Sequence, residues 1–155
     1  MSHDKFMREA IRLSRENVKN GGGPFGAVIV KDGEIVASGW NQVTSSNDPT
    51  AHAEVVAIRN ACEKLGTFQL DGCIVYTSCE PCPMCLGAIY WARPKQVFYG
   101  NTKKDAADIG FDDDFIYQEL ELDPAKRNVP FVEHLRDEAI EAFKDWTDNT
   151  DKIEY

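Results

Sequence analysis

The first part of the chain switches from a helical to an extended pattern of apolar residues. Apolar side chains over residues 4–19 recur every three or four positions, which predicts an amphipathic helix. The glycines and proline of 21–24 end that pattern. Two apolar runs, 25–31 and 34–40, then flank Asp32-Gly33, a dipeptide that favours a tight two-residue turn between strands. We therefore expect a helix followed by a β-hairpin.

The middle of the chain alternates between the same two patterns. Residues 42–49 are polar and predict a loop, and 51–65 has the apolar spacing of a helix. A buried strand is expected at 73–77, a second helix at 82–92 and another strand at 96–100. Strands that alternate with helices indicate a layered α/β sheet with crossover connections. The pattern thus predicts a three-layer α/β/α fold.

Beyond residue 101 the pattern is weaker. An acidic turn is expected at 112–114, a strand at 129–133 and a helix at 138–146, whereas 148–155 has little core-forming character and is expected to fray. The sequence shows no internal repeat, low-complexity tract or interdomain linker. At 155 residues, the chain has the length of one domain, so we expect a single domain over 1–155.

Charge narrows the class of partner. The chain has 26 acidic and 17 basic residues and a net charge of −9. Its mean field therefore repels phosphate backbones, which disfavours a nucleic-acid partner and favours a small-molecule substrate. No apolar run approaches the roughly 20 residues that a membrane-spanning helix needs, and the N-terminus lacks an apolar signal core, so no membrane partner is expected.

The cysteines point to metal binding. Of the five, Cys79, Cys82 and Cys85 fall within seven positions, and an odd number this closely spaced suits a metal site in a reducing, cytoplasmic setting better than a disulfide framework. Cys62 and Cys73 lie in helix and strand patterns and are expected in the core.

Three zinc-ligand candidates and one spare carboxylate lie in two short motifs. These are His52-Ala53-Glu54 and Pro81-Cys82-Pro83-Met84-Cys85. Cys82 and Cys85 are three apart, so both sulfurs reach one ion from one helical turn, and Pro81 suits a helix start, where thiolate is favoured. His52 also opens a helix, with Thr50 as a plausible cap. Three protein ligands leave a fourth position for water, which is the arrangement of a catalytic zinc.

Cys79 offers two alternative readings of the same region. With Cys82 and Cys85 it spells the start of an iron–sulfur run, but the residue at the next expected ligand position is Ile89. A fourth zinc ligand at Cys79 would close the site, but Cys79 lies at a strand end before Pro81, whose fixed φ turns the chain away. We expect Cys79 to be structural.

Glu54 is the candidate catalytic residue. Acidic residues are favoured in any first helical turn, so position alone does not distinguish Glu54. Beside a zinc-activated water, however, its carboxylate has the general acid/base role that deamination needs: it takes up the water proton and delivers it to the ring nitrogen and the leaving amine. His-x-Glu followed by Pro-Cys-x-x-Cys is the known signature of zinc deaminases that act on nucleobases.

On these residues the chain is identified as a member of the cytidine deaminase superfamily, and it particularly resembles the small bacterial guanine deaminases. The resemblance covers 23–100, is strongest at Thr50–Glu54 and Glu80–Pro94, and extends to the C-terminus. It implies a mixed five-stranded sheet, one zinc per subunit, and hydrolytic deamination of guanine to xanthine and ammonia. It also implies a homodimer in which a lid segment, 101–155, is exchanged between subunits.

The resemblance further implies six base-binding residues. They are Asn41 after the second strand, Phe25 and Trp91 as flanking aromatics, the backbone N–H of Ala53, and Asp113 and Tyr155 from the C-terminal segment. Taken alone, an aspartate run is typical of a solvated turn and a terminal tyrosine of a disordered end. Guanine presents ring N–H donors, however, and a carboxylate at Asp113 would accept from them.

Other functions share this signature. A tRNA adenosine deaminase is disfavoured by the acidic charge and by a lid over a small base. Cytosine and guanosine stay open as substrates because pocket shape alone separates them. A zinc-stabilised scaffold without activity is the alternative from another class. It predicts four protein ligands and a dispensable Glu54.

Overall fold

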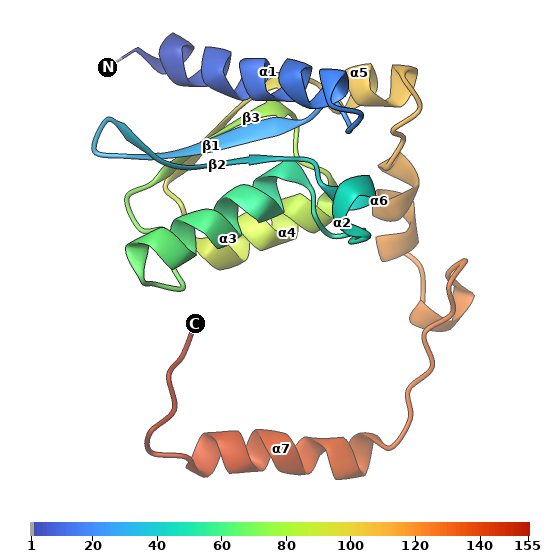
Figure 1. The fold of residues 1–155 in the computed structure, drawn as a ribbon. Coiled ribbons are helices and arrows are strands. Elements are labelled where there is room, and N and C mark those ends of the chain that lie inside the picture. Colours follow the sequence, from blue (N-terminus) through green and yellow to red (C-terminus); the bar gives the residue numbers. More distant parts are fainter. Residues whose placement is uncertain (1) are drawn as a thin grey trace. The chain divides into compact units, whose positions relative to one another are not determined.

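The computed structural model describes residues 2–155, and the chain divides into two compact units, Met1–Asp113 and Asp114–Tyr155 (Figure 1). The first unit is built on a four-stranded sheet in the order β2-β1-β3-β4. Its strands are β1 (Gly26–Lys31), β2 (Glu34–Trp40), β3 (Ile74–Cys79) and β4 (Gln96–Asn101). β1 runs antiparallel to β2 and β3, and β3 runs parallel to β4, so the sheet is mixed, as expected.

Helices cover both faces of this sheet. α1 (His3–Lys19) lies across one face, and α3 (Ala53–Leu65) and α4 (Pro83–Ala92) lie against the other (Figure 1). The expected three-layer α/β/α arrangement is confirmed. The two faces bury different side chains.

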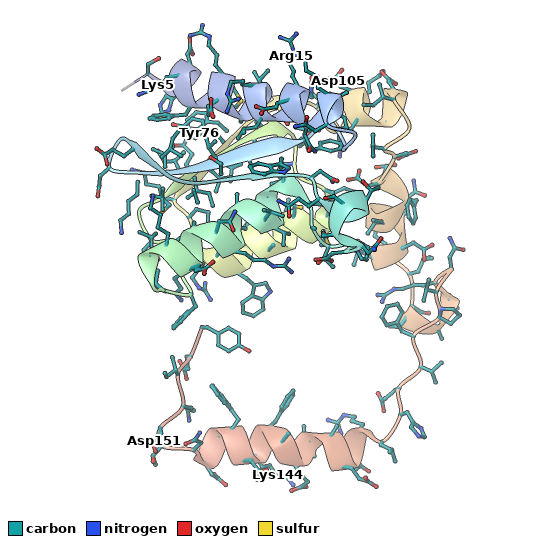
Figure 2. The ribbon with its side chains drawn as sticks, viewed as in Figure 1. Lys5, Arg15, Tyr76, Asp105, Lys144 and Asp151 are labelled. Carbon is teal, nitrogen blue, oxygen red and sulfur yellow. The ribbon has the colours of Figure 1, made fainter. Side chains whose placement is uncertain are left out.

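The face under α1 combines aromatic with aliphatic side chains, namely Phe6, Ala10, Leu13, Val28, Val30, Ile74 and Tyr76. Tyr76 points from β3 toward α1 (Figure 2), where its ring lies 5.3 Å from that of Phe6 and its hydroxyl lies 2.7 Å from Nδ1 of His3. The face under α3 and α4 is lined by small and aliphatic side chains, namely Ala27, Ile29, Ala53, Ala57, Ala61, Leu70, Cys73, Val75 and Ala92. Burial of these two sets is the main favourable contribution to folding of the first unit.

Gly39 sets how closely α3 approaches the sheet. A Cβ atom at this position of β2 would lie 2.3 Å from the carbonyl oxygen of Ala53 and 2.5 Å from the backbone N of Ala57. Only glycine leaves room for that approach. The first turn of α3, which carries Ala53 and Glu54, is therefore held directly against the sheet.

The predicted elements of the first unit match the observed ones to within a few residues, and two short helices were missed. α2 (Val43–Ser46) lies in the expected polar loop, and α5 (Lys103–Asp108) follows β4. α5 begins with a capping box in which the Thr102 and Asp105 side chains each accept a bond from the other's backbone N–H.

The predicted fifth strand is wrong. Residues 129–133 form neither a helix nor a strand, and Val129 and Val132 are 71% and 80% exposed. Pro130 has no N–H to give to a strand partner, and the Phe131 N–H is bonded to the Pro124 carbonyl. Within residues 2–155 the sheet therefore has four strands.

The second unit is helical. It contains α6 (Asp114–Leu120), a 3₁₀ turn, η1 (Pro124–Lys126), and α7 (Arg136–Asp148), which includes the helix expected at 138–146. None of its residues is buried within the chain. No helix among the described residues is long and apolar enough to cross a membrane.

Candidate metal centre and active site

Two helix N-termini meet at the candidate metal centre. His52 is the N-cap of α3 and Cys82 is the N-cap of α4. The proline in the first turn of α4 is Pro83, whereas the sequence had suggested Pro81 for the helix start. The expected cap at Thr50 is wrong, because His52 holds that position and the Thr50 hydroxyl bonds instead to Asp48. The positive ends of both helices therefore face the same place and favour thiolate there.

His52, Cys82 and Cys85 form one cluster of potential metal ligands. Their ligand atoms all lie within 4.8 Å of one another. Nδ1 of His52 is 3.5 Å from Sγ of Cys82 and 3.6 Å from Sγ of Cys85. Zinc bonds of about 2.3 Å to sulfur and about 2.0 Å to nitrogen, at tetrahedral angles, place such atoms about 3.5 Å apart. The three side chains therefore fit a zinc ion.

The pKa values of the two cysteines shift in opposite directions. Hydrogen bonding from Cys85 and from His52 lowers the pKa of Cys82 to about 4, so Cys82 favours thiolate at neutral pH. The same bond to Cys82, together with burial, raises the pKa of Cys85. A zinc ion binds cysteine as thiolate, so its binding would displace the proton from Cys85.

Glu54 lies beside these ligands. It is only 6% exposed, and burial raises the pKa of its carboxyl group, while a hydrogen bond with Cys85 opposes that rise. A buried carboxyl group with a raised pKa next to a metal cluster suits proton transfer. The structure thus brings Glu54 to the three ligand candidates, as the motif predicts.

Cys79 lies outside the cluster. It is buried at the end of β3, its Sγ lies 3.9 Å from the Thr102 carbonyl oxygen, and burial raises its pKa to about 11. Among the described residues, the grouped potential ligands are one histidine and two cysteines, which does not fit an iron–sulfur cluster. The reading of Cys79 as a structural thiol agrees with this geometry.

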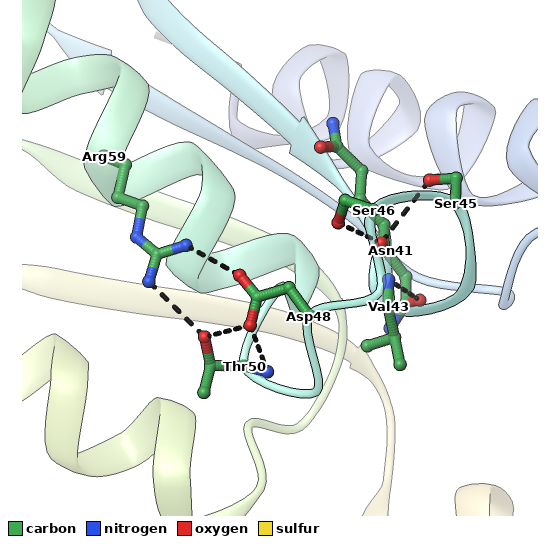
Figure 3. Close-up of polar contacts among 8 residues, drawn as sticks. Asn41, Val43, Ser45, Ser46, Asp48, Thr50 and Arg59 are labelled. Carbon is green, nitrogen blue, oxygen red and sulfur yellow. Dashed lines mark hydrogen bonds and ion pairs between the residues drawn. The ribbon is translucent and has the colours of Figure 1, made fainter.

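Asn41 and Phe25 lie side by side at the end of the hairpin. The Asn41 N–H donates to the Phe25 carbonyl (3.2 Å), and Oδ1 of Asn41 accepts from the Val43 N–H (3.2 Å) (Figure 3). With Oδ1 engaged by the backbone, Nδ2 is the group through which Asn41 would bind a ligand acceptor.

Asp113 belongs to the same compact unit as the metal cluster. Its negative charge adds to the effect of the Cys82 hydrogen bond in raising the pKa of His52, and to the effect of burial in raising that of Cys79. Asp113 therefore lies near the cluster within one chain.

Phe111 is a neighbour of the site that the sequence reasoning missed. Its ring packs edge-on against Phe25 with centroids 5.0 Å apart. A local signal for this position of Phe111 was available in Gly110, whose φ of +95° turns the chain after α5. Phe111 follows this turn directly and precedes the run of aspartates.

The remaining three candidates lie in different surroundings. Ala53 is fully buried in the first turn of α3, where backbone N–H groups lack helical partners. Trp91 is 62% exposed near the far end of α4, about 9 Å along the axis from Cys85 at 1.5 Å per residue. Tyr155 is 69% exposed and belongs to the second unit. Their roles in base binding stay predictions.

The cluster agrees with a family match. Residues 1–101 match the model of the cytidine and deoxycytidylate deaminase zinc-binding region. The chain belongs to this deaminase family. It is therefore a zinc-binding deaminase domain, and zinc is its cofactor.

Relatives within the deaminase family differ in how much of the chain they match. A guanine deaminase of Bacillus subtilis is 58% identical over the full length of both proteins. A solved structure of guanine deaminase from Bacillus subtilis matches with a TM-score of 0.97 at 58% identity, covering 100% of this chain and 99% of that one. A tRNA-specific adenosine deaminase of Aquifex aeolicus is 40% identical, over 67% of this chain and 69% of its own length.

Proposed function

We propose that this protein catalyses the hydrolytic deamination of guanine to xanthine and ammonia. The observation that carries the proposal is the extent of similarity to a guanine deaminase, which includes the segment after residue 101 that the family model leaves out. The tRNA-specific relative matches about two thirds of this chain. Similarity over the C-terminal segment therefore supports guanine over adenosine in tRNA as the substrate.

We propose His52, Cys82 and Cys85 as the zinc ligands. When bound, zinc would lower the pKa of a coordinated water toward about 7. Glu54 is the proton carrier: its carboxylate accepts one proton from the attacking water and delivers it to the purine ring nitrogen, and it then carries the second proton, from the added hydroxyl group, to the departing amino group. Guanine and water thus become xanthine and ammonia, and Glu54 returns to its starting state. The burial of Glu54 supports this role because it raises the pKa of the carboxyl group toward neutral pH, where one group can act first as a base and then as an acid.

Four residues of the first unit would hold the base. The Ala53 N–H, at the open end of α3, and Nδ2 of Asn41 are donors for purine acceptors. The Phe25 ring offers a face for stacking, and its contact with Phe111 fixes the plane of that ring. The Asp113 carboxylate accepts from ring N–H groups, and its charge already reaches the cluster.

We also propose a cytoplasmic homodimer that exchanges its C-terminal segment, bringing Tyr155 and the exposed Trp91 to the site. Exposed large apolar side chains in the second unit support this: Phe115, Leu120, Leu122, Val129, Phe131, Val132, Leu135, Phe143, Trp146, Ile153 and Tyr155. A soluble monomer rarely leaves so much apolar surface in water, so a second copy is expected to cover it. All five cysteines are free thiols, which suits a reducing compartment.

Adenosine in tRNA is the second candidate substrate, favoured by the 40% identity to a tRNA-specific deaminase. The net charge of −9 opposes it because phosphate backbones would be repelled.

The deciding experiment is ammonia release from zinc-loaded protein given guanine, guanosine, adenine, adenosine, cytosine, cytidine or an anticodon stem-loop RNA. Turnover of guanine alone supports the proposal. Turnover of another base would keep the zinc chemistry but discard the proposed base contacts, and turnover of the RNA would favour the second candidate. A protein with full zinc and no activity on any of them would favour the scaffold.

A further inference from the structure

We propose that Asp48 is a positioning residue for the zinc ligand His52 and acts through the backbone of Thr50. This proposal rests on the assignment of His52 as a ligand and is independent of the substrate. Asp48 itself lies outside the ligand cluster. It acts on the short segment 48–52, which lies between α2 and α3 and ends at His52.

The Asp48 carboxylate closes a tight turn onto Thr50 (Figure 3). Its Oδ1 atom accepts from the Thr50 N–H at 2.9 Å and from the Thr50 hydroxyl at 2.7 Å. Hydrogen bonds to a charged carboxylate are stronger than those between neutral groups. Together the two bonds fix both the backbone and the side chain of Thr50.

Thr50 in turn holds His52. The Thr50 carbonyl accepts from the His52 N–H at 2.8 Å, and the Asp48 carbonyl accepts from the Ala51 N–H at 3.1 Å. From the other side, the Gln42 N–H donates to the Ala51 carbonyl at 2.9 Å. Every residue between Asp48 and His52 except Pro49 therefore makes a backbone hydrogen bond. These bonds fix the position of the backbone at His52, where α3 begins.

Arg59 adds a weaker tie from α3. Its Nη1 lies 3.4 Å from Oδ2 of Asp48 and its Nη2 lies 3.4 Å from the Thr50 hydroxyl (Figure 3). These contacts are long, and the side chains of Arg59 and Asp48 are 58% and 36% exposed, so solvent screens the pair. In agreement, the pKa of Asp48 is lowered chiefly by the Thr50 bonds and only secondarily by Arg59. Thr50 is thus the main partner of Asp48.

This connection matters because zinc tolerates little displacement of its ligands. Nδ1 of His52 lies 3.5 and 3.6 Å from the two sulfurs, which is close to the tetrahedral spacing. A looser backbone before His52 would let Nδ1 leave that position more often. The expected consequence is faster loss of zinc.

The test is the rate of zinc transfer from the loaded enzyme to a chromogenic chelator at neutral pH, with kcat and KM for guanine and the thermal midpoint measured alongside. Asp48→Ala should release zinc about tenfold faster, since loss of a group that orients a ligand typically weakens metal binding by 10–100-fold. Asp48→Asn keeps an Oδ1 acceptor for Thr50 and should restore slow release. Thr50→Val, which keeps the backbone bond and loses the hydroxyl, should fall between them.

Two controls on α3 separate positioning from general loosening. Arg59→Ala should release zinc at close to the wild-type rate. Asn60→Ala removes a bond to the Ser38 carbonyl (3.0 Å) that joins α3 to β2, so it should lower the thermal midpoint without speeding release. Any one of three outcomes would overturn the proposal. They are release of zinc from Asp48→Ala at the wild-type rate, release from Asp48→Asn as fast as from Asp48→Ala, and release from Asn60→Ala as fast as from Asp48→Ala. Because release is measured without substrate, its outcome does not depend on guanine turnover.

Discussion

The side-chain amide of Asn17 donates to the main-chain carbonyl of Asn41 at 2.9 Å, and the same Nδ2 group donates to the Gly23 carbonyl at 2.8 Å. The buried Asn17 side chain on α1 therefore joins the segment just before Phe25, at Gly23, to the residue that follows β2, Asn41. Gly22 packs against it so closely that a Cβ there would lie 2.6 Å from Nδ2. A helix on one face of the sheet thus fixes the proposed base-binding end of the hairpin.

Replacing Asn17 by alanine should weaken guanine binding without removing zinc. The change removes two hydrogen bonds, although the Gly23 carbonyl keeps its bond from the Phe25 N–H at 2.9 Å. Losing the Asn17 bond to the Asn41 carbonyl costs about 1–3 kcal/mol of stability, and it loosens Asn41. We expect a higher KM for guanine, a thermal midpoint lower by several degrees and an unchanged zinc content, measured by steady-state kinetics, calorimetry and metal analysis. Asn20→Ala, at the exposed end of the same helix, is the matched control. A wild-type KM in Asn17→Ala would separate Asn17 from the site.

Cys79 should be dispensable for metal binding. We expect Cys79→Ser to keep one zinc per subunit, whereas Cys85→Ser should lose most of its zinc. With a pKa of about 11, the Cys79 thiol is neutral at pH 7–8 and should react with alkylating agents only as the pH approaches 11, because only the thiolate is nucleophilic. Mass spectrometry of alkylated protein over a pH series measures this. Loss of zinc from Cys79→Ser would instead indicate a closed, four-ligand site.

Asp113 should contribute to substrate binding and not to metal binding. Asp113→Asn replaces one acceptor oxygen by a donor, so loss of a charged hydrogen-bond partner should raise KM for guanine by about ten- to a hundredfold, equivalent to roughly 1.5–3 kcal/mol. Zinc content should stay at one per subunit. Asp112→Asn is the control of equal charge. Equal KM values in the two variants would exclude a specific role for Asp113.

Segment exchange can be tested by mixing two defective subunits. If Tyr155 completes the partner's site, co-expression of Glu54→Ala with a variant lacking Tyr155 yields heterodimers in which one site has both residues. Random pairing would then restore about a quarter of the wild-type sites, since about half of the dimers are mixed and each holds one intact site. If Tyr155 serves its own subunit, the mixture shows only the activity of the separate variants. Matched co-expression of two Glu54→Ala chains gives the baseline.

Periodicity predicted the layered part of the fold well because its elements bury one regular face. The hairpin followed from Asp32 and Gly33, which both adopt positive φ, and the helices at 53–65 and 83–92 followed from apolar spacing. The metal cluster was predictable for a similar reason: His52 and Cys82 are tied to helix starts that the local sequence specifies.

Elements without a buried face were harder to predict. α2 and α5 have no buried residue, so their apolar spacing carries little signal, although Thr102 and Asp105 at the start of α5 do form a capping box. The strand expected at 129–133 was suggested by apolar residues, but these lie exposed in a unit without buried residues. Apolar content there is consistent with a surface that a second copy covers. Phe111 was missed because its packing against Phe25 depends on how the chain returns after Gly110.

The proposed deamination mechanism depends most directly on Glu54, and it is tested by measuring guanine turnover and bound zinc in the same samples of wild type and Glu54→Gln. The substitution keeps the size of the buried side chain and removes its ability to carry a proton. We predict one zinc per subunit in both proteins and a kcat lower by about 10²–10⁴-fold in the variant, the usual contribution of general acid/base catalysis. Near-normal turnover by zinc-loaded Glu54→Gln would contradict the proposed mechanism.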